Sequence, residues 1–109
     1  MSRISTHVLD TAAGKPAADI PVRLEAKQNG AWSTVAEGAT DADGRCKVLA
    51  EDLNAGQYRI VFLTTAYFSE RGRTSLYPEI AVTFTCDGEA DYHLPLLLSD
   101  NGYTTYRGS

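Results

Sequence analysis

An Asn-Gly pair between two alternating segments is the feature that most constrains the fold of this chain. Residues 20–27 (IPVRLEAK) alternate apolar with polar side chains, which is typical of a strand with one buried face. Asn29-Gly30 follows, and both residue types tolerate the positive φ angles that a tight hairpin turn requires. Residues 31–36 supply the return strand. The sequence therefore predicts an antiparallel β-hairpin.

The rest of the chain repeats this pattern of short strands separated by turns. Alternation is clearest over residues 58–62 and 80–86. Shorter strands are predicted at residues 4–10, 45–49, 90–98 and 103–106. One short helix is predicted over residues 65–71, capped by Thr65 and ended by Gly72. About eight strands with regular turns predict an all-β sandwich, with residues 1–109 in one domain.

Length and charge narrow the possible partners. The chain has 109 residues and a formal net charge of −4 with scattered basic residues, which disfavours nucleic acid and anionic membranes. No segment stays apolar over the roughly 18 residues that a spanning helix needs, and the first residues lack the pattern of a secretory signal. We therefore expect a cytoplasmic protein. Cys46 and Cys86 show no metal-binding spacing and are expected to be reduced core residues.

Strand alternation places both histidines on outer faces. If the apolar side chains of residues 4–8 face the core, His7 faces outward, and the same reasoning over residues 92–96 turns His93 outward. An outward histidine is more commonly a solvated residue than a catalyst. If the two strands share one sheet, however, the imidazoles gather on one surface.

Arg45 follows the turn formed by residues 41–44 (DADG). Cys46 and Val48 are predicted to face the core, which turns Arg45 outward, where a surface ion pair is its ordinary role. The turn invites a calcium-binding interpretation, but the glycine and glutamate positions of an EF-hand loop are not filled. Motifs of nucleophilic-elbow hydrolases, nucleotide sites and zinc proteases are absent.

The last ten residues, DNGYTTYRGS, keep a strand-like segment almost to Ser109. One interpretation is a final strand with a short ragged end. The other is a chain terminus delivered to a site, where it carries the Arg107 guanidinium and the hydroxyl and carboxylate of Ser109.

Five segments in order carry a resemblance to a known family: STHVLDT, TDADGR, AYF with YPEIAVTF, YHLPLLLS and the final YRGS. Over essentially the whole chain they resemble the 5-hydroxyisourate hydrolases, the transthyretin-related enzymes of urate degradation. The resemblance implies a transthyretin-like sandwich of two four-stranded sheets with one short helix. It also implies a homotetramer, a dimer of dimers with active sites in a channel between the dimers.

The resemblance also implies the residues of the site. The catalytic residues would be His7, Arg45, His93 and Ser109. Substrate would be bound by Arg45 together with Tyr106, Arg107, Gly108 and Ser109. Every one of these motif positions is filled in this sequence.

The implied reaction opens the six-membered ring of 5-hydroxyisourate between N1 and C6, giving 2-oxo-4-hydroxy-4-carboxy-5-ureidoimidazoline. We expect His93 and His7 to activate water and move the proton, with His93 the preferred base, while Arg45 stabilises the developing negative charge. Ser109 would orient water or substrate through its hydroxyl or its carboxylate, and Arg107 would pair with a carboxylate or a substrate oxygen. No covalent intermediate, cofactor or catalytic metal is expected.

Two other functions are compatible with the same fold. Transthyretin itself is a hormone carrier, so a small-molecule carrier is the main alternative, although carriers lack the two histidines, the arginine and the YRGS tail together. A structural module of the adhesion type shares the phrases GKP and TDADGR, but such modules are normally tandem and exported.

Overall fold

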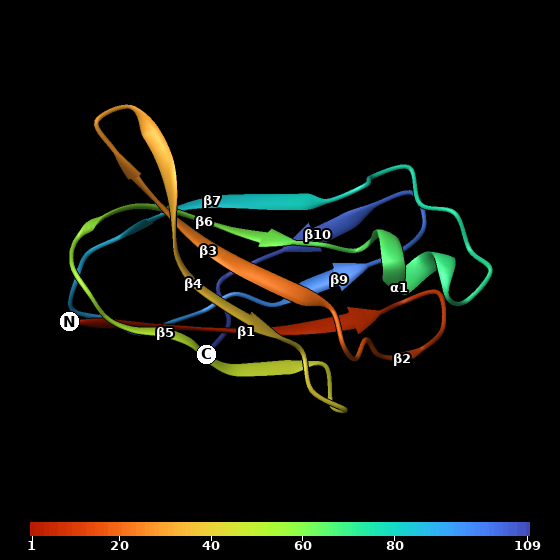
Figure 1. Ribbon diagram of the computed structural model, residues 1–109. Helices are drawn as coiled ribbons and strands as arrows, with labels where there is room; N and C mark the ends of the chain where they lie inside the picture. Colours follow the sequence, from red (N-terminus) through yellow and green to blue (C-terminus); the bar gives the residue numbers. More distant parts are fainter.

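Two β-sheets pack against each other in this computed structural model, which describes all residues from 1 to 109 (Figure 1). The first sheet consists of four antiparallel strands in the order β4 (Ala31–Ala39), β3 (Pro21–Gln28), β6 (Gly56–Phe62) and β7 (Ile80–Cys86). The predicted hairpin forms β3 and β4 and is confirmed. At its turn Asn29 and Gly30 have φ angles of 53° and 78°, as a tight hairpin requires.

The second sheet is built around β1 (Ser2–Asp10). β5 (Arg45–Leu53) and β2 (Lys15–Pro16) pair antiparallel along one side of β1. β8 (Tyr92–His93) and β9 (Leu96–Leu98) pair parallel along the other side. β5 and β2 follow one another along one side of β1, and β8 and β9 follow one another along the other side. The sheet is therefore four strands wide once its edge strand is added.

That edge strand is β10 (Tyr103–Thr105), which pairs antiparallel with β9. The predicted all-β sandwich of two sheets with one short helix is thereby confirmed. A single strand was predicted over residues 90–98, whereas the structure has β8 and β9 separated by Leu94 and Pro95. Proline has no backbone N–H to donate to a ladder, so regular pairing is interrupted there.

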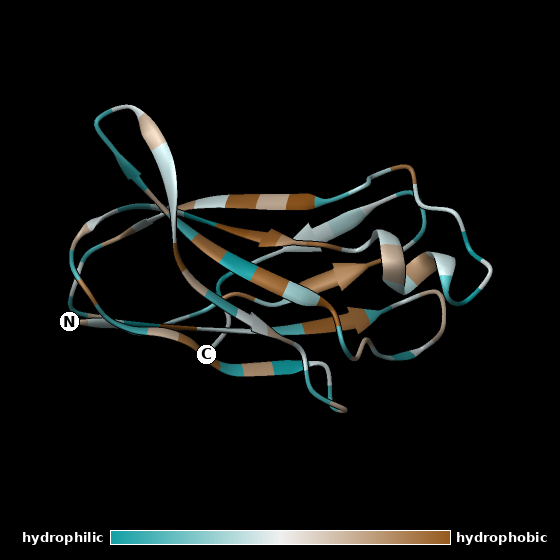
Figure 2. Cartoon of the chain, viewed as in Figure 1, coloured by the Kyte–Doolittle hydropathy of each residue, from teal (hydrophilic) through white to brown (hydrophobic).

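Alternating side chains build the core between the two sheets. Figure 2 shows hydrophobic bands alternating with hydrophilic ones along β3. The core cluster contains 20 buried residues drawn from both sheets and the helix, including Ile4, Leu24, Phe62 and Leu96. Each such side chain contributes about 1.5–3 kcal/mol when fully buried. Both cysteines are buried and free, as predicted.

Because of a bulge in β5, the predicted orientation of one side chain is wrong. Val48 was expected in the core, but its side chain is 48% exposed, and Leu49 is buried instead. The pairing with β1 shifts register between the partners of Thr6 and Ile4, because Thr6 lies opposite Cys46 and Ile4 lies opposite Ala50. Between these two pairs β5 has two more residues than β1, and this insertion interrupts the regular alternation of β5. The prediction that Cys46 faces the core is confirmed.

The helix α1 (Thr65–Ser69) is shorter than predicted, and its cap differs. Thr64 occupies the N-cap position and makes no capping hydrogen bond through its side chain. The predicted cap, Thr65, is the first helical residue and donates its hydroxyl to the carbonyl of Pro78 at 2.6 Å. Tyr67 and Phe68 are the residues that anchor the helix to the core. No helix of this structure has the length and apolar character needed to cross a membrane.

Candidate active site

The central strand β1 brings the three predicted outward residues to one sheet. His7 lies directly opposite Arg45 of β5, and Ser5, two residues earlier on the same face of β1, lies opposite His93 of β8. Residues directly opposite each other on paired strands project from the same face. The strands of His7 and His93 thus share one sheet, which is what the sequence required for the two imidazoles to gather on one surface.

The turn before β5 fixes the position of Arg45, the first residue of that strand. The carboxylate of Asp41 accepts backbone N–H bonds from Asp43 and Arg45, both at 2.9 Å. The N–H of Arg45 is the main reason that the pKa of Asp41 lies below its ordinary value. Gly44 has a φ of +74°, and a Cβ there would lie 2.4 Å from the carbonyl oxygen of Val8. Only glycine therefore fits this turn.

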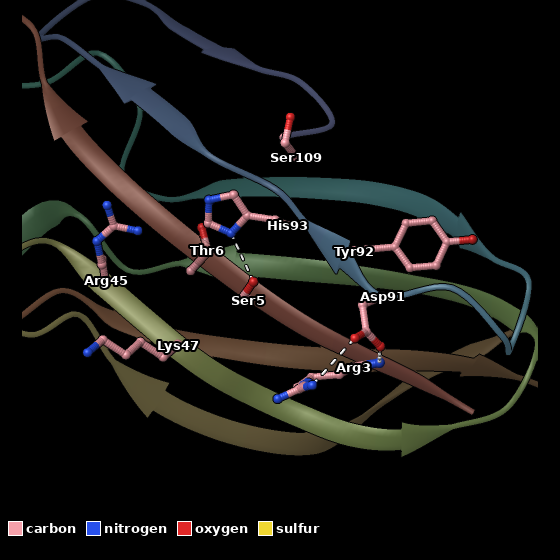
Figure 3. Close-up of a pocket in the computed structure, with 10 residues that line it drawn as sticks. Arg3, Ser5, Thr6, Arg45, Lys47, Asp91, Tyr92, His93 and Ser109 are labelled. Atoms are coloured by element: carbon pink, nitrogen blue, oxygen red, sulfur yellow. Dashed lines mark hydrogen bonds and ion pairs between the residues drawn. The ribbon is translucent and has the colours of Figure 1, made fainter.

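A pocket of about 380 Å³ opens on this face of the sheet (Figure 3). It contains His93 and Arg45 from the predicted site, together with Gly108 and Ser109 of the tail. The complete lining is Arg3, Ser5, Thr6, Arg45, Lys47, Asp91, Tyr92, His93, Gly108 and Ser109. The structure therefore brings together most of the predicted residues. His7, Tyr106 and Arg107 do not line this pocket.

His93 has the environment of a neutral imidazole. Burial lowers its pKa below the ordinary value of 6.5, and the positive charges of Arg45 and His7 lower it further. Its Nδ1 lies 2.9 Å from the hydroxyl oxygen of Ser5. In Figure 3 the second ring nitrogen, Nε2, faces the side of the pocket that carries Arg45. A neutral imidazole with one nitrogen open to a pocket can accept a proton there.

His7 is held at the edge of this site. Its Nε2 lies 2.8 Å from the carbonyl oxygen of Asp43, in the turn before β5. A carbonyl oxygen only accepts hydrogen bonds, so Nε2 must carry the proton. His7 therefore connects β1 to the turn that precedes Arg45.

The C-terminal tail reaches the site through a backbone contact. Gly108 forms an isolated β-bridge with His93, and its N–H donates to the His93 carbonyl at 2.7 Å. A Cβ at Gly108 would lie 2.7 Å from Cδ2 of the His93 ring. The absence of a side chain at this position thus allows the tail to pack against the imidazole, which carries Ser109 into the pocket.

The other tail residues have different surroundings. The guanidinium of Arg107 lies 4.5 Å from the centre of the Tyr92 ring, a cation–π arrangement, and makes no ion pair. Tyr106 is 51% exposed. The Arg107 contact with Tyr92 holds the tail beside β8.

Sequence reasoning missed six side chains of the pocket that bear polar or charged groups: Arg3, Ser5, Thr6, Lys47, Asp91 and Tyr92. Ser5 bonds to His93, Lys47 has no ion-pair partner, and Arg3 pairs with Asp91 at 3.5 Å. Alternation would have found Ser5 and Lys47, because each lies two residues from a predicted site residue on the same strand. The pocket is rich in cations although the chain is acidic overall.

The arrangement suits attack by water on a carbonyl group. A neutral imidazole faces the pocket, and the guanidinium of Arg45 has no hydrogen-bond partner within the chain, so its donors are free for a ligand oxygen. No group of three or more His, Cys, Asp or Glu side chains is placed to hold a metal ion.

Comparison with known proteins gives one consistent result. The family model described as "HIUase/Transthyretin family" matches residues 4–108. The chain is 44% identical to the 5-hydroxyisourate hydrolase of Salmonella dublin over 109 residues, which cover 97% of this chain and 80% of the relative. Among solved structures, the Klebsiella pneumoniae 5-hydroxyisourate hydrolase matches with a TM-score of 0.90 and 37% identity over 100% of both chains. Sea bream transthyretin in complex with thyroxine matches with a TM-score of 0.91 and 34% identity, covering 96% of this chain and 93% of that chain.

Proposed function

This chain belongs to the HIUase/Transthyretin family, and from that premise we propose that its pocket hydrolyses 5-hydroxyisourate to 2-oxo-4-hydroxy-4-carboxy-5-ureidoimidazoline in urate degradation. The observation that carries the proposal is that His93 and Arg45, whose guanidinium has no hydrogen-bond partner in the chain, line one pocket. The names of its relatives, which include the hydrolases of Salmonella dublin and Klebsiella pneumoniae, support the same reaction.

Water is the nucleophile in this mechanism. Nε2 of His93 takes a proton from the water as its oxygen bonds to C6 of the substrate, and the C6 carbonyl becomes an oxyanion. When the oxyanion collapses, the C6–N1 bond breaks and the imidazolium returns its proton to N1. The product carries a carboxyl group at C6, and the imidazole is regenerated. The lowered pKa of His93 supports this role because a base must be unprotonated at neutral pH.

Arg45 binds the carbonyl oxygen that becomes negative. Its guanidinium remains charged at every relevant pH, and its planar set of N–H donors matches a flat, carbonyl-rich ligand. An interaction that strengthens as charge develops lowers the barrier rather than merely tightening binding. Lys47 adds a second positive charge to the same wall of the pocket. We also propose that His7 assists proton handling, while its contact with the carbonyl oxygen of Asp43 holds the turn that precedes Arg45.

The tail completes the substrate site in this proposal. Ser109 orients water or substrate through its hydroxyl or carboxylate, and Gly108 brings it there. Arg107 and Tyr106 do not line the pocket, and Arg107 holds the tail in place by stacking on Tyr92. Expression of the chain with one alanine added after Ser109 tests the tail, because the extra residue adds bulk at the pocket wall. We expect turnover to fall sharply, and full turnover would refute the assigned role.

We also propose a homotetramer, a dimer of dimers in which the face bearing this pocket meets a second copy. The cationic, imidazole-bearing face supports this arrangement, since a covering subunit would shield the reaction from bulk water. Sedimentation equilibrium would test it, and a monomer at micromolar concentration would refute it. A cytoplasmic location is proposed as well, supported by the two free buried thiols.

The reaction is tested by making the substrate in place. Urate and urate oxidase generate 5-hydroxyisourate, and the protein is added in water enriched in ¹⁸O. We expect one ¹⁸O atom in the carboxyl group of the product, formed faster than in the spontaneous reaction. If the folded protein instead binds thyroxine and causes no acceleration, the carrier function takes its place, as the likeness to the transthyretin–thyroxine complex would then suggest.

A further inference from the structure

The side chain of Ser5 makes a single hydrogen bond, and that bond goes to the proposed base. Its hydroxyl oxygen lies 2.9 Å from Nδ1 of His93. The contact is built by the sheet, since Ser5 of β1 and His93 of β8 are direct register partners in a parallel pair. Ser5 is half-buried, and its hydroxyl has no other partner in the chain. Figure 3 shows the bond on the side of the imidazole away from Arg45.

The direction of this hydrogen bond decides what His93 can do. If Nδ1–H donates to the Ser5 oxygen, the neutral ring has a free lone pair on Nε2, which is the nitrogen that faces the pocket. If the Ser5 hydroxyl donates to Nδ1, the neutral ring carries its proton on Nε2 and cannot accept another there. The direction of this hydrogen bond therefore determines whether Nε2 of His93 can act as a base or as an acid.

We propose that Ser5 is a positioning residue that accepts the Nδ1–H of His93 and holds the imidazole in the tautomer with an unprotonated Nε2. The catalytic consequence of this contact rests on the proposed function, whereas the contact itself does not. An imidazolium carries protons on both nitrogens. A Ser5 oxygen that already accepts from Nδ1–H keeps the same bond when Nε2 takes a proton from water, whereas a donating hydroxyl would have to turn.

The use of a serine rather than a carboxylate fits the charges around the ring. A carboxylate at this position would favour the charged imidazolium and raise the pKa of the base. A hydroxyl orients the ring without adding charge. The titratable and charged groups that surround His93 are His7 and Arg3 on β1, Arg45 and Lys47 on β5, Asp91 before β8, and the carboxylate of Ser109. Cations dominate this set, so the ring stays neutral and its tautomer matters.

The chain allows a direct reading of this tautomer because it has only two histidines. Protein labelled with ¹⁵N-histidine gives ring nitrogen signals from His7 and His93, and the His7→Gln variant identifies which belong to His93. At alkaline pH we expect the Nε2 of His93 to give the signal of an unprotonated nitrogen and Nδ1 that of an N–H. A protonated Nε2 in the parent protein would overturn the proposal, whatever any variant does.

A matched pair of variants tests the consequence for turnover. Ser5→Thr keeps a hydroxyl, whereas Ser5→Val has nearly the same shape as that threonine without one, and both suit a strand. We expect Ser5→Val to lose roughly tenfold or more in kcat with KM changed by less than about twofold, and to lose the fixed tautomer. Ser5→Thr should keep both. The exposed Ser33→Ala variant on the opposite sheet is a control.

The outcomes separate this inference from the proposed function. If Ser5→Val and Ser5→Thr turn over at rates within about twofold of each other, the positioning role is wrong. If the protein shows the expected tautomer but no hydrolase activity, the reaction is wrong while the contact stands.

Discussion

A buried carboxylate at the end of β1 gives the most quantitative stability prediction for this chain. The side chain of Asp10 is fully buried, and it accepts hydrogen bonds from the Tyr67 hydroxyl at 2.7 Å and the backbone N–H of Ala13 at 3.0 Å. Arg73 forms an ion pair with it and also pairs with Asp100. We predict that Asp10→Asn, which removes the charge and keeps the shape, destabilises the fold.

The magnitude follows from the pKa of Asp10. Burial alone would raise this pKa, but the hydrogen bonds from Arg73 and Tyr67 outweigh burial and lower the pKa from 3.8 to about 2. A carboxyl group whose pKa falls on folding stabilises the native state above its unfolded pKa, and this stabilisation is lost as the pH falls through the folded pKa. The difference is worth about 2.4 kcal/mol at neutral pH, and about half of it is lost by pH 3.

The assay is urea unfolding of the parent and Asp10→Asn, followed by circular dichroism at a fixed protein concentration. The parent should exceed the variant by about 2–3 kcal/mol in free energy of unfolding at pH 7, and by about half as much near pH 3. Asp52→Asn, an exposed position in β5 with no ion pair, controls for the general effect of removing a negative charge. A gap that stays constant from pH 7 to pH 3, or no gap at pH 7, would refute the linkage between this network and stability.

Three further predictions concern the pocket. Gly108→Ala should lower kcat/KM by roughly tenfold or more, because its Cβ would collide with His93. Gly102→Ala is the control and should have little effect, since its Cβ would meet only the Ser99 hydroxyl at 3.6 Å. Equal activity of the two variants would count against the tail contact. Arg45→Lys keeps the charge but loses the planar donors, so kcat/KM should fall by roughly tenfold, and a value within twofold of the parent would contradict this reasoning. The pH profile of kcat/KM should rise with pH to a plateau with a midpoint below 6.5. Arg45→Gln should move that midpoint upward, because the Arg45 charge helps to lower the pKa of His93. A midpoint that does not move would exclude Arg45 as a cause of the lowered His93 pKa.

Alternation of side chains predicted most of the fold. It gave the hairpin, the strands that flank the helix and the facing of the β1 side chains, because a strand with one buried face must alternate. It failed at Val48, where a bulge inserts extra residues into β5. The position of a bulge depends on pairing with the neighbouring strand, so a single strand's sequence does not reveal it.

The candidate site was predictable only in part. The facing of strand residues and the family resemblance together indicated Arg45 and His93 from the sequence alone. Ser5 was not found, because its importance lies in its register with His93, which is set by the parallel pairing of β1 with β8. Pairing between segments so distant in sequence cannot be obtained from local patterns. The helix cap shows the same limit at short range, since Thr65 is engaged by the carbonyl of Pro78 rather than by its own helix.

The most direct test of the account is the decay of 5-hydroxyisourate, generated by urate oxidase and followed by ultraviolet absorbance. The parent protein should accelerate this decay well above the spontaneous rate. His93→Ala should lose roughly a hundredfold or more of that acceleration, while Lys27→Ala on the opposite sheet should retain it. No acceleration by the folded parent, or undiminished acceleration by His93→Ala, would contradict the assignment of this pocket as a hydrolytic site with His93 as its base.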